Sequence, residues 1–445
     1  MPGSASRDRG PLRPYDACLP SCRSHEGGLV PQRKIFHGWW IVLTGAVLQL
    51  LQGSLLGQAY GSYIVVLGAD FGWTRTQLSL ASALREMEGG IVGPLQGWLV
   101  DRVGPRRVTR AGIVIFGAGF MLFSQVQTLG MFYASFMVMA IGASLMGYLT
   151  ITTAVVQWFV RRRSTALSLT SVGGALGGVV VPITVLALET FGWRATAFGS
   201  GVLVMAVGLP ITQLLVHRPS DKGLGPDGAP MVEGAANSTN AMSPGDFTLG
   251  EALRQPSFWW LSIGHGFALF VVGAVNTHMV SHLTETLGYS LGRAAFVYSM
   301  LTLMFMFGTL AGGWIGDHSS KRFMAFGCMG AHAIGMLLLS HAAATWMVVS
   351  FVIIHGLAWG MRGPQMAALR ADYFGAGAFG KIMGVSNMIV IVGAIFGPVF
   401  AGLVYDQTGS YRIGFDTLAV LAAVGSIFFA LAKRPKPRVT AEVAL

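Results

Sequence analysis

Charged side chains are scarce in this 445-residue chain. Asp, Glu, Lys and Arg together make up 11% of it, whereas soluble domains carry about 25%. So few charges cannot cover a water-facing surface of this size, which excludes an ordinary soluble enzyme. Cysteine is also rare. The three residues Cys18, Cys22 and Cys328 exclude a disulfide scaffold, and the Cys18/Cys22 pair has no second pair downstream to complete a metal site.

Long apolar runs make up most of the chain. Hydrophobic residues make up 53% of the chain, and they recur in runs of about 18–27 residues, each long enough to cross a hydrocarbon core of roughly 30 Å as a helix. The sequence therefore predicts an all-α membrane protein. Its twelve expected transmembrane helices are 38–64, 77–100, 107–126, 131–157, 165–188, 195–216, 257–283, 293–315, 322–341, 345–368, 381–405 and 411–432.

One long polar gap divides these helices into six and six. The predicted organisation is an N-terminal six-helix bundle at 36–216, a cytoplasmic linker at 217–255 and a C-terminal six-helix bundle at 256–433. The flanking segments 1–35 and 434–445 are expected to be cytoplasmic tails, the first of them disordered. Residues 1–35 lack the apolar core and the small-residue cleavage site of a signal peptide.

The basic residues follow the positive-inside rule. With a cytoplasmic N-terminus, 24 of the 30 Lys and Arg residues fall in segments on the inside and four in loops on the outside. This asymmetry predicts that both termini lie in the cytoplasm, below an inner or plasma membrane. It also explains the net charge of +11 without a nucleic-acid partner.

An internal repeat supports two related halves. The stretch GWLVDRVGPRR at 97–107 recurs as GWIGDHSSKR at 313–322, with an offset of 216 residues between equivalent Gly, Asp and Arg positions. Parallel repeats of six helices are a transporter architecture in which the substrate site lies at the midplane between the halves.

The first of these stretches resembles the loop signature of the major facilitator superfamily, and the resemblance extends over about residues 36–435. It implies a cytoplasmic latch in which an aspartate binds a helix end across the loop. The alternative interpretation is generic positive-inside charge. The latch residues implied are Gly97, Asp101, Arg102, Gly104, Arg106, Arg107, Asp317 and Arg322.

Two further stretches point to one branch of that superfamily. HGWWIV at 37–42 and WFVRRRSTALSLTSVGGALG at 158–177 are similar to motifs of monocarboxylate porters and oxalate–formate antiporters. The resemblance implies transport of a small organic anion by proton symport or exchange. The branch's binding residues do not transfer, because the first helix lacks its lysine and 293–315 lacks an Asp/Arg pair.

Ionisable residues inside membrane spans are costly and therefore mark functional sites. Arg362 has no acid within one helical turn, and a guanidinium binds a carboxylate in a bidentate fork. We therefore expect Arg362 to bind the carboxylate of the substrate, with Arg85 as a second candidate. The alternative is that Arg362 pairs with Glu86 or Glu88 on another helix.

The two glutamates are the candidate proton-coupling residues. Arg85 and Glu88 share a helix face, and one carboxylate would be free to take a proton when an anion occupies an arginine. A purely structural ion pair is the alternative. The remaining candidates for lining a substrate cavity are Tyr148, Asn276 and His278.

The function predicted is secondary transport of a small mono- or dicarboxylate by alternating access, in a monomer with no cofactor. Two rivals remain open: efflux of amphipathic drugs by the same fold, and a transporter-like sensor. No nucleophile, metal-ligand or ATP-binding pattern occurs in a plausible context, so the chain is not expected to be an enzyme.

Overall fold

The computed structural model describes residues 35–57, 59–73, 75–230 and 246–436. It separates a compact unit, Phe36–Leu445, from the segment Met1–Ile35. The predicted disordered tail, its two cysteines, the middle of the linker and the last nine residues lie outside the described residues, apart from Ile35.

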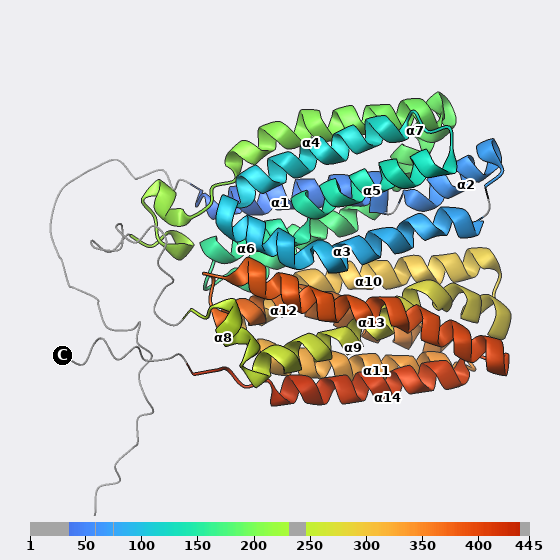
Figure 1. Cartoon of the computed structure of the whole chain (residues 1–445). Helices are drawn as coiled ribbons and strands as arrows, with labels where there is room; N and C mark the ends of the chain where they lie inside the picture. Colours follow the sequence, from blue (N-terminus) through green and yellow to red (C-terminus); the bar gives the residue numbers. More distant parts are fainter. Residues whose placement is uncertain (1–34, 58, 74, 231–245, 437–445) are drawn as a thin grey trace, which may run out of the picture. The chain divides into compact units, whose positions relative to one another are not determined.

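The described residues form helices and no β-strand, which confirms the all-α prediction; one isolated bridge joins Leu224 and Pro230. The helices of the first half lie together in Figure 1. They are α1 (Gly38–Gln52), α2 (Tyr60–Phe71), α3 (Arg75–Val103), α4 (Pro105–Phe123), α5 (Leu129–Met146), α6 (Tyr148–Trp158) and α7 (Arg163–Ile211).

The second half follows a short helix in the linker, α8 (Leu249–Leu253). Its helices are α9 (Pro256–Ser281), α10 (Leu291–His318), α11 (Lys321–Ser340), α12 (Thr345–Phe374), α13 (Phe379–Thr408) and α14 (Arg412–Leu431). Each half has its own buried apolar core.

Twelve crossings are present in the described part of the chain, as predicted. Helix α7 contains two of them, because Gly192 adopts a φ of 76° that interrupts the helix. By length and hydropathy alone, nine described segments qualify as membrane spans. Three crossings account for the difference between nine and twelve. The two crossings of α7 count as one segment, and α3 and α4 do not qualify because their charged residues lower their hydropathy.

Several crossings are interrupted in ways that the sequence did not predict. Gly147 leaves the helical conformation and divides the fourth crossing into α5 and α6. The segments Gly53–Gly57 and His282–Thr286 are π-helical. Such irregular backbone inside a membrane protein is tolerated where it is buried in protein or lines a cavity, and π-bulges concentrate at functional sites.

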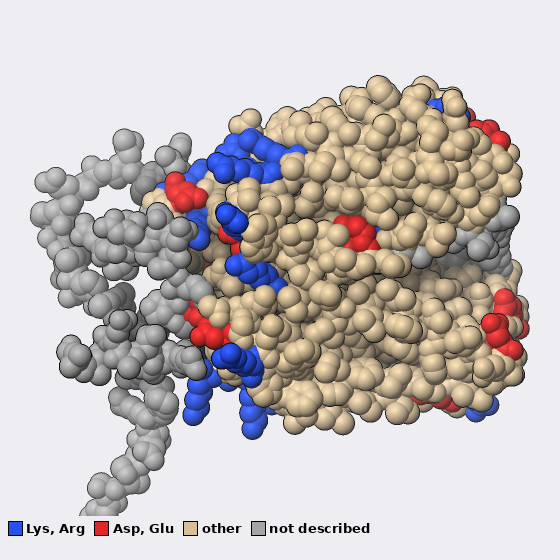
Figure 2. Space-filling model, viewed as in Figure 1, with Lys and Arg blue, Asp and Glu red and all other residues tan. Residues whose placement is uncertain are grey.

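The two halves pack together through small residues on α3 and α13. A Cβ atom on Gly97 would overlap the carbonyl oxygen of Gly380, and one on Gly384 would overlap Gly93. Only glycine therefore permits this approach of the two backbones. Lys and Arg gather at one end of the described helices (Figure 2), where α4 and α11 begin and α14 ends; we call this the basic end.

The first part of the linker is anchored at the basic end. His37 Nε2 lies 2.9 Å from the carbonyl oxygen of Leu214, and Lys222 Nζ donates to His37 Nδ1 at 3.1 Å. Asp227 accepts hydrogen bonds from the amides of Val160 and Arg161 at 3.1 and 2.8 Å. These contacts fasten 214–230 to the first half.

Two histidines make this anchor sensitive to pH. Burial lowers the pKa of His217, which packs against Gly104, and the nearby Arg218 lowers it further. Burial also lowers the pKa of His37, beyond what its hydrogen bond to Leu214 restores. Both side chains are thus held neutral, while the free state protonates near pH 6.5.

We expect the linker to loosen in acid. The stabilisation from neutral His37 and His217 is complete above about pH 6.5 and is lost as the pH falls through the lowered folded values. Tryptic cleavage after Lys222 should therefore accelerate, relative to a non-specific loop substrate, between pH 7.5 and pH 5.5. The double variant His37→Gln/His217→Gln should abolish this acceleration; its persistence would contradict the assignment.

Candidate functional site

A buried polar group lies beside the break in the fourth crossing. Glu88 on α3 is 7% exposed, and its Oε2 accepts a hydrogen bond of 2.7 Å from the hydroxyl of Ser144. Gln96, two turns further along α3, donates to the carbonyl oxygen of Ser144 at 2.5 Å and to Thr150 Oγ1 at 3.2 Å. At the break, the carbonyl of Ser144 accepts from the amide of Gly147 at 3.0 Å as well as from Gln96, so α3 is fastened to the end of α5.

Arg362 on α12 is fully buried. Its Nε and Nη1 atoms have no hydrogen-bond partner among the described residues, and no described carboxylate forms an ion pair with it. The sequence left open a pairing with Glu86 or Glu88; Glu88 accepts a hydrogen bond from Ser144 on α5. A buried guanidinium without a counter-charge is costly unless a ligand supplies one.

Arg370 was missed as a candidate. The expected helix ended at residue 368, so this arginine was counted with the cytoplasmic segments, but α12 continues to Phe374 and Arg370 is fully buried. Its Nη1 donates to the carbonyl of Met366 at 2.9 Å, and Nη2 lies 3.5 Å from His265 Nδ1 on α9. The spacing of eight residues from Arg362, which places both on one helix face, is the signal that could have identified it.

Tyr148 connects the first half to this arginine. It is the first residue of α6, directly after the break, and its phenol lies within electrostatic range of the Arg370 guanidinium. The predicted candidate Tyr148 and the missed Arg370 therefore both lie where α6 faces α12.

Further basic side chains surround Arg362 inside the second half. His332 Nδ1 and His355 Nδ1 lie 3.1 Å apart, so one ring donates to the other. Both histidines, together with His265, are within electrostatic range of Arg362. No group of three or more metal-ligating side chains was found in the described part of the chain.

The other predicted candidates lie elsewhere. His278 Nε2 is 2.9 Å from the carbonyl oxygen of Pro398 and Nδ1 is 3.3 Å from the hydroxyl of Tyr411, so it joins three helices of its own half. Asn276 is exposed and accepts a hydrogen bond of 3.4 Å from Tyr298. Arg85 is half-buried on α3, and the side chain of Glu86 lies outside the described part.

The repeated aspartates occupy equivalent positions at the basic end. Asp101 on α3 accepts hydrogen bonds from the amides of Gly380 and Lys381, at 3.1 and 3.0 Å, in the first turn of α13. Asp317 on α10 accepts from Ser164 and Thr165, at 2.8 and 3.0 Å, in the first turn of α7. Each carboxylate thus caps the N-terminus of a helix in the opposite half, where the helix dipole favours negative charge.

A third contact between the halves was missed by the sequence analysis. Arg163, at the start of α7, donates to Asp372 on α12 at 2.5 Å, and Lys321 on α11 pairs with the same carboxylate at 2.8 Å. By contrast, Arg322 donates to the carbonyl of Ala430 on α14, and Arg102 stacks on Trp98. These two predicted latch residues therefore bind within their own halves.

Comparison with known proteins identifies the family. The model of the Major Facilitator Superfamily matches residues 42–389 and 313–444. The chain belongs to this superfamily. Its fold and family are those of multi-pass membrane transporters rather than enzymes.

The relatives are distant. A probable hexose phosphate transport protein of Chlamydia pneumoniae is 24% identical over 81% of this chain and 84% of its own length. Monocarboxylate transporter 13 of Bos taurus is 24% identical over 87% of this chain and 88% of its own length, which bears out the similarity to monocarboxylate porters. The crystal structure of the human organic anion transporter MFSD10 (TETRAN) superposes with a TM-score of 0.66 at 16% identity, over 90% of this chain and all of that one.

We expect Asp101→Ala and Asp317→Ala each to open the basic end. A helix cap contributes about 1 kcal/mol, so each loss should raise the open population about fivefold. Spin labels at Val103→Cys and Phe323→Cys, both exposed near the basic end on opposite halves, would report the separation after the native cysteines are changed to Ser.

The matched control is Asp406→Ala, which removes an exposed carboxylate from the opposite end of α13. Its distance distribution should equal that of the parent. Unchanged distances in both aspartate variants would refute the predicted latch.

Proposed function

We propose that this transporter moves a small organic anion, and that Arg362 and Arg370 bind its acidic group. The observation that carries the proposal is the pair of fully buried arginines on one face of α12 with no ion pair in the described structure. Because the free energy of burying an unpaired charge is several kcal/mol, an anionic substrate that neutralises it binds favourably.

The charge balance of the midplane supports an anion. The expected set of Arg85 and Arg362 against Glu86 and Glu88 would be neutral. The buried Arg370, about two turns nearer the basic end on the same helix, adds one positive charge to this set, with both glutamates ionised. Monocarboxylates and short dicarboxylates carry the compensating charge and present it as a fork that matches a guanidinium.

The electrostatic proximity of Tyr148 and Arg370 supports a site that both halves share. An anion on Arg370 would lie beside Tyr148, whose hydroxyl can donate a hydrogen bond to it. Binding there would engage α6 of the first half and α12 of the second together. Such a substrate can bias the equilibrium between two arrangements of the halves.

Glu88 is the proposed proton-coupling residue. It is buried, it lies on α3 between the substrate-facing break and the interface helix α13, and its hydrogen-bond donor Ser144 comes from the interrupted crossing. A carboxylate in this position can exchange a proton with one side of the membrane when α3 moves relative to α13. The alternative to proton-coupled transport is the exchange of one anion for another without proton movement.

The basic end is proposed to face the cytoplasm of an inner or plasma membrane, because Lys and Arg accumulate on the cytoplasmic side. The two aspartate caps and the Arg163–Asp372 pair hold that end closed. The arrangement then corresponds to the outward-facing state of alternating access. The names of the relatives, a monocarboxylate transporter and an organic anion transporter, agree with the substrate class.

We expect carboxylates to stabilise the purified protein and Arg362→Ala to abolish most of that effect. Binding at a hundredfold excess over Kd contributes about 2.7 kcal/mol. A charge-assisted hydrogen bond is worth about 1.5–3 kcal/mol, so the variant should bind roughly ten- to hundredfold more weakly. Thermal unfolding in the presence of a panel of mono- and dicarboxylates measures the stabilisation of the parent protein and its loss in Arg362→Ala. Arg370→Ala is measured in the same way.

Arg293→Gln is the control, because it removes an exposed arginine in the first turn of α10, at the end of that helix away from the basic end. It should retain the full ligand shift. Stabilisation by hydrophobic cations instead of carboxylates would sink the anion proposal and favour drug efflux by the same fold.

A second prediction concerns coupling. In proteoliposomes, Glu88→Gln should exchange substrate across the membrane but fail to accumulate it in response to a pH gradient, because the neutral amide cannot carry a proton. Ser144→Ala is the matched control, since it removes the hydrogen-bond donor and keeps the carboxylate. Gradient-driven accumulation by Glu88→Gln equal to that of the parent would exclude this residue as the coupling site.

A further inference from the structure

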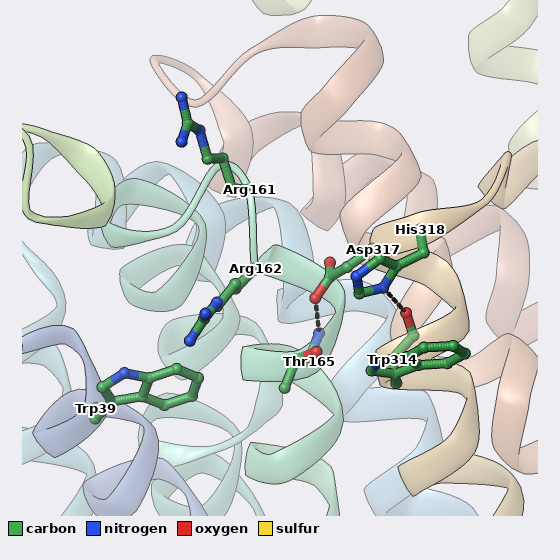
Figure 3. A pocket seen from close by; sticks show the side chains of 7 residues that line it. All are labelled: Trp39, Arg161, Arg162, Thr165, Trp314, Asp317 and His318. Atoms are coloured by element: carbon green, nitrogen blue, oxygen red, sulfur yellow. Dashed lines mark hydrogen bonds between the residues drawn. The ribbon is translucent and has the colours of Figure 1, made fainter.

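A separate cavity of about 530 Å³ lies at the basic end, outside the proposed substrate site. The first half contributes Trp39, Arg161 and Arg162, and the second contributes Trp314, Asp317 and His318 (Figure 3). The cavity therefore spans the junction of the halves, beside one of the two aspartate caps.

Its net charge is positive, because its lining includes two arginines and one carboxylate. Arg161 and Arg162 precede α7, and neither forms an ion pair within the described ranges. The one carboxylate of the cavity, Asp317, is already occupied by the amides of Ser164 and Thr165. Figure 3 shows Arg162 directed toward Trp39, so a cation and an indole ring face the same space, whereas Arg161 points away from it.

The other side of the cavity continues into an apolar stripe. Trp314 is 65% exposed, and Leu310 and Phe307 lie four and seven residues before it on α10, 41% and 48% exposed. This spacing places all three on one helix face that points out of the protein. A stripe of this kind contacts lipid chains, and tryptophan marks the level of the headgroups.

We propose that the cavity binds the phosphate of an anionic phospholipid, with Arg162 on the phosphate, Arg161 adding positive charge at the rim, and the acyl chains along Trp314, Leu310 and Phe307. A lipid headgroup and a soluble phosphate ester would present the same phosphate to the arginine. The apolar stripe beside the cavity favours the lipid. Basic pockets between transmembrane helices on the cytoplasmic side have the composition that such headgroups select.

The cavity also links lipid binding to conformation. Its walls come from both halves, and Asp317 holds those walls together through α7. Separation of the halves at the basic end would take Arg162 away from Trp314 and dismantle the pocket. A ligand that binds one arrangement only shifts the equilibrium toward it, so the lipid should favour the closed basic end.

The binding test uses the full-length purified chain and native mass spectrometry. Phosphatidylglycerol should remain bound where phosphatidylcholine dissociates. The double variant Arg161→Gln/Arg162→Gln should weaken phosphatidylglycerol binding about tenfold, since each cation near anionic lipid contributes severalfold. Lys433→Gln/Arg434→Gln removes two exposed cations from the end of α14 and should change the affinity less than twofold.

Three outcomes would overturn the proposal. Equal retention of phosphatidylcholine would show that the phosphate charge is not recognised at this site. Equal losses in the two double variants would show a general surface effect. Displacement of the lipid by millimolar inorganic phosphate would identify a soluble phosphate as the ligand.

The conformational arm uses the spin-labelled pair at residues 103 and 323 in nanodiscs. Replacing phosphatidylcholine by a mixture with phosphatidylglycerol should increase the short-distance population. The increase should vanish in Arg161→Gln/Arg162→Gln and persist in the control. Identical distributions in the two lipid compositions would refute the link between this cavity and closure.

Discussion

The bilayer core offers no water to a charged group, and this constraint shapes the structure around α12. Arg362 and Arg370 must obtain their hydrogen bonds from protein or from a bound anion. The described contacts satisfy Arg370 in part, through Met366 and His265, and leave two donors of Arg362 unmet. If the substrate is the proposed anion, its binding would supply these hydrogen bonds, so the loaded and the empty transporter would differ in free energy at this helix.

The contacts at the basic end follow a different principle, because the proposed transport cycle requires them to break. Asp101 and Asp317 each bind two amides at the first turn of a helix, where the backbone offers unpaired donors. When the contact opens, water can replace both partners at the membrane surface. The glycine pairs between α3 and α13 allow close approach without interlocking side chains. Such an interface is specific and still separable.

The sequence predicts the twelve crossings and the paired aspartates well, because hydropathy and an internal repeat are local signals. The sequence does not predict which arginines are buried, because that burial depends on tertiary packing. Arg370 and Arg163 read as surface charges, but α12 extends six residues beyond the expected end and Arg163 is only 5% exposed beside Asp372. The break at Gly147 was also not foreseen, since a glycine among apolar residues suits a continuous helix equally well. Arg322, matched by repeat position, binds α14 because its copy of the loop has diverged.

The buried charges of opposite sign belong to different halves. The buried carboxylate of Glu88 belongs to the first half, and the buried guanidinium groups belong to the second. In the described structure, Arg362 and Arg370 form no ion pair with a carboxylate of the first half, so no such pair holds α12 against that half. An anion on α12 and a proton on α3 would cancel both charges. The loaded midplane then costs less to enclose than either singly occupied form, and this difference in free energy is a physical basis for coupling the two movements.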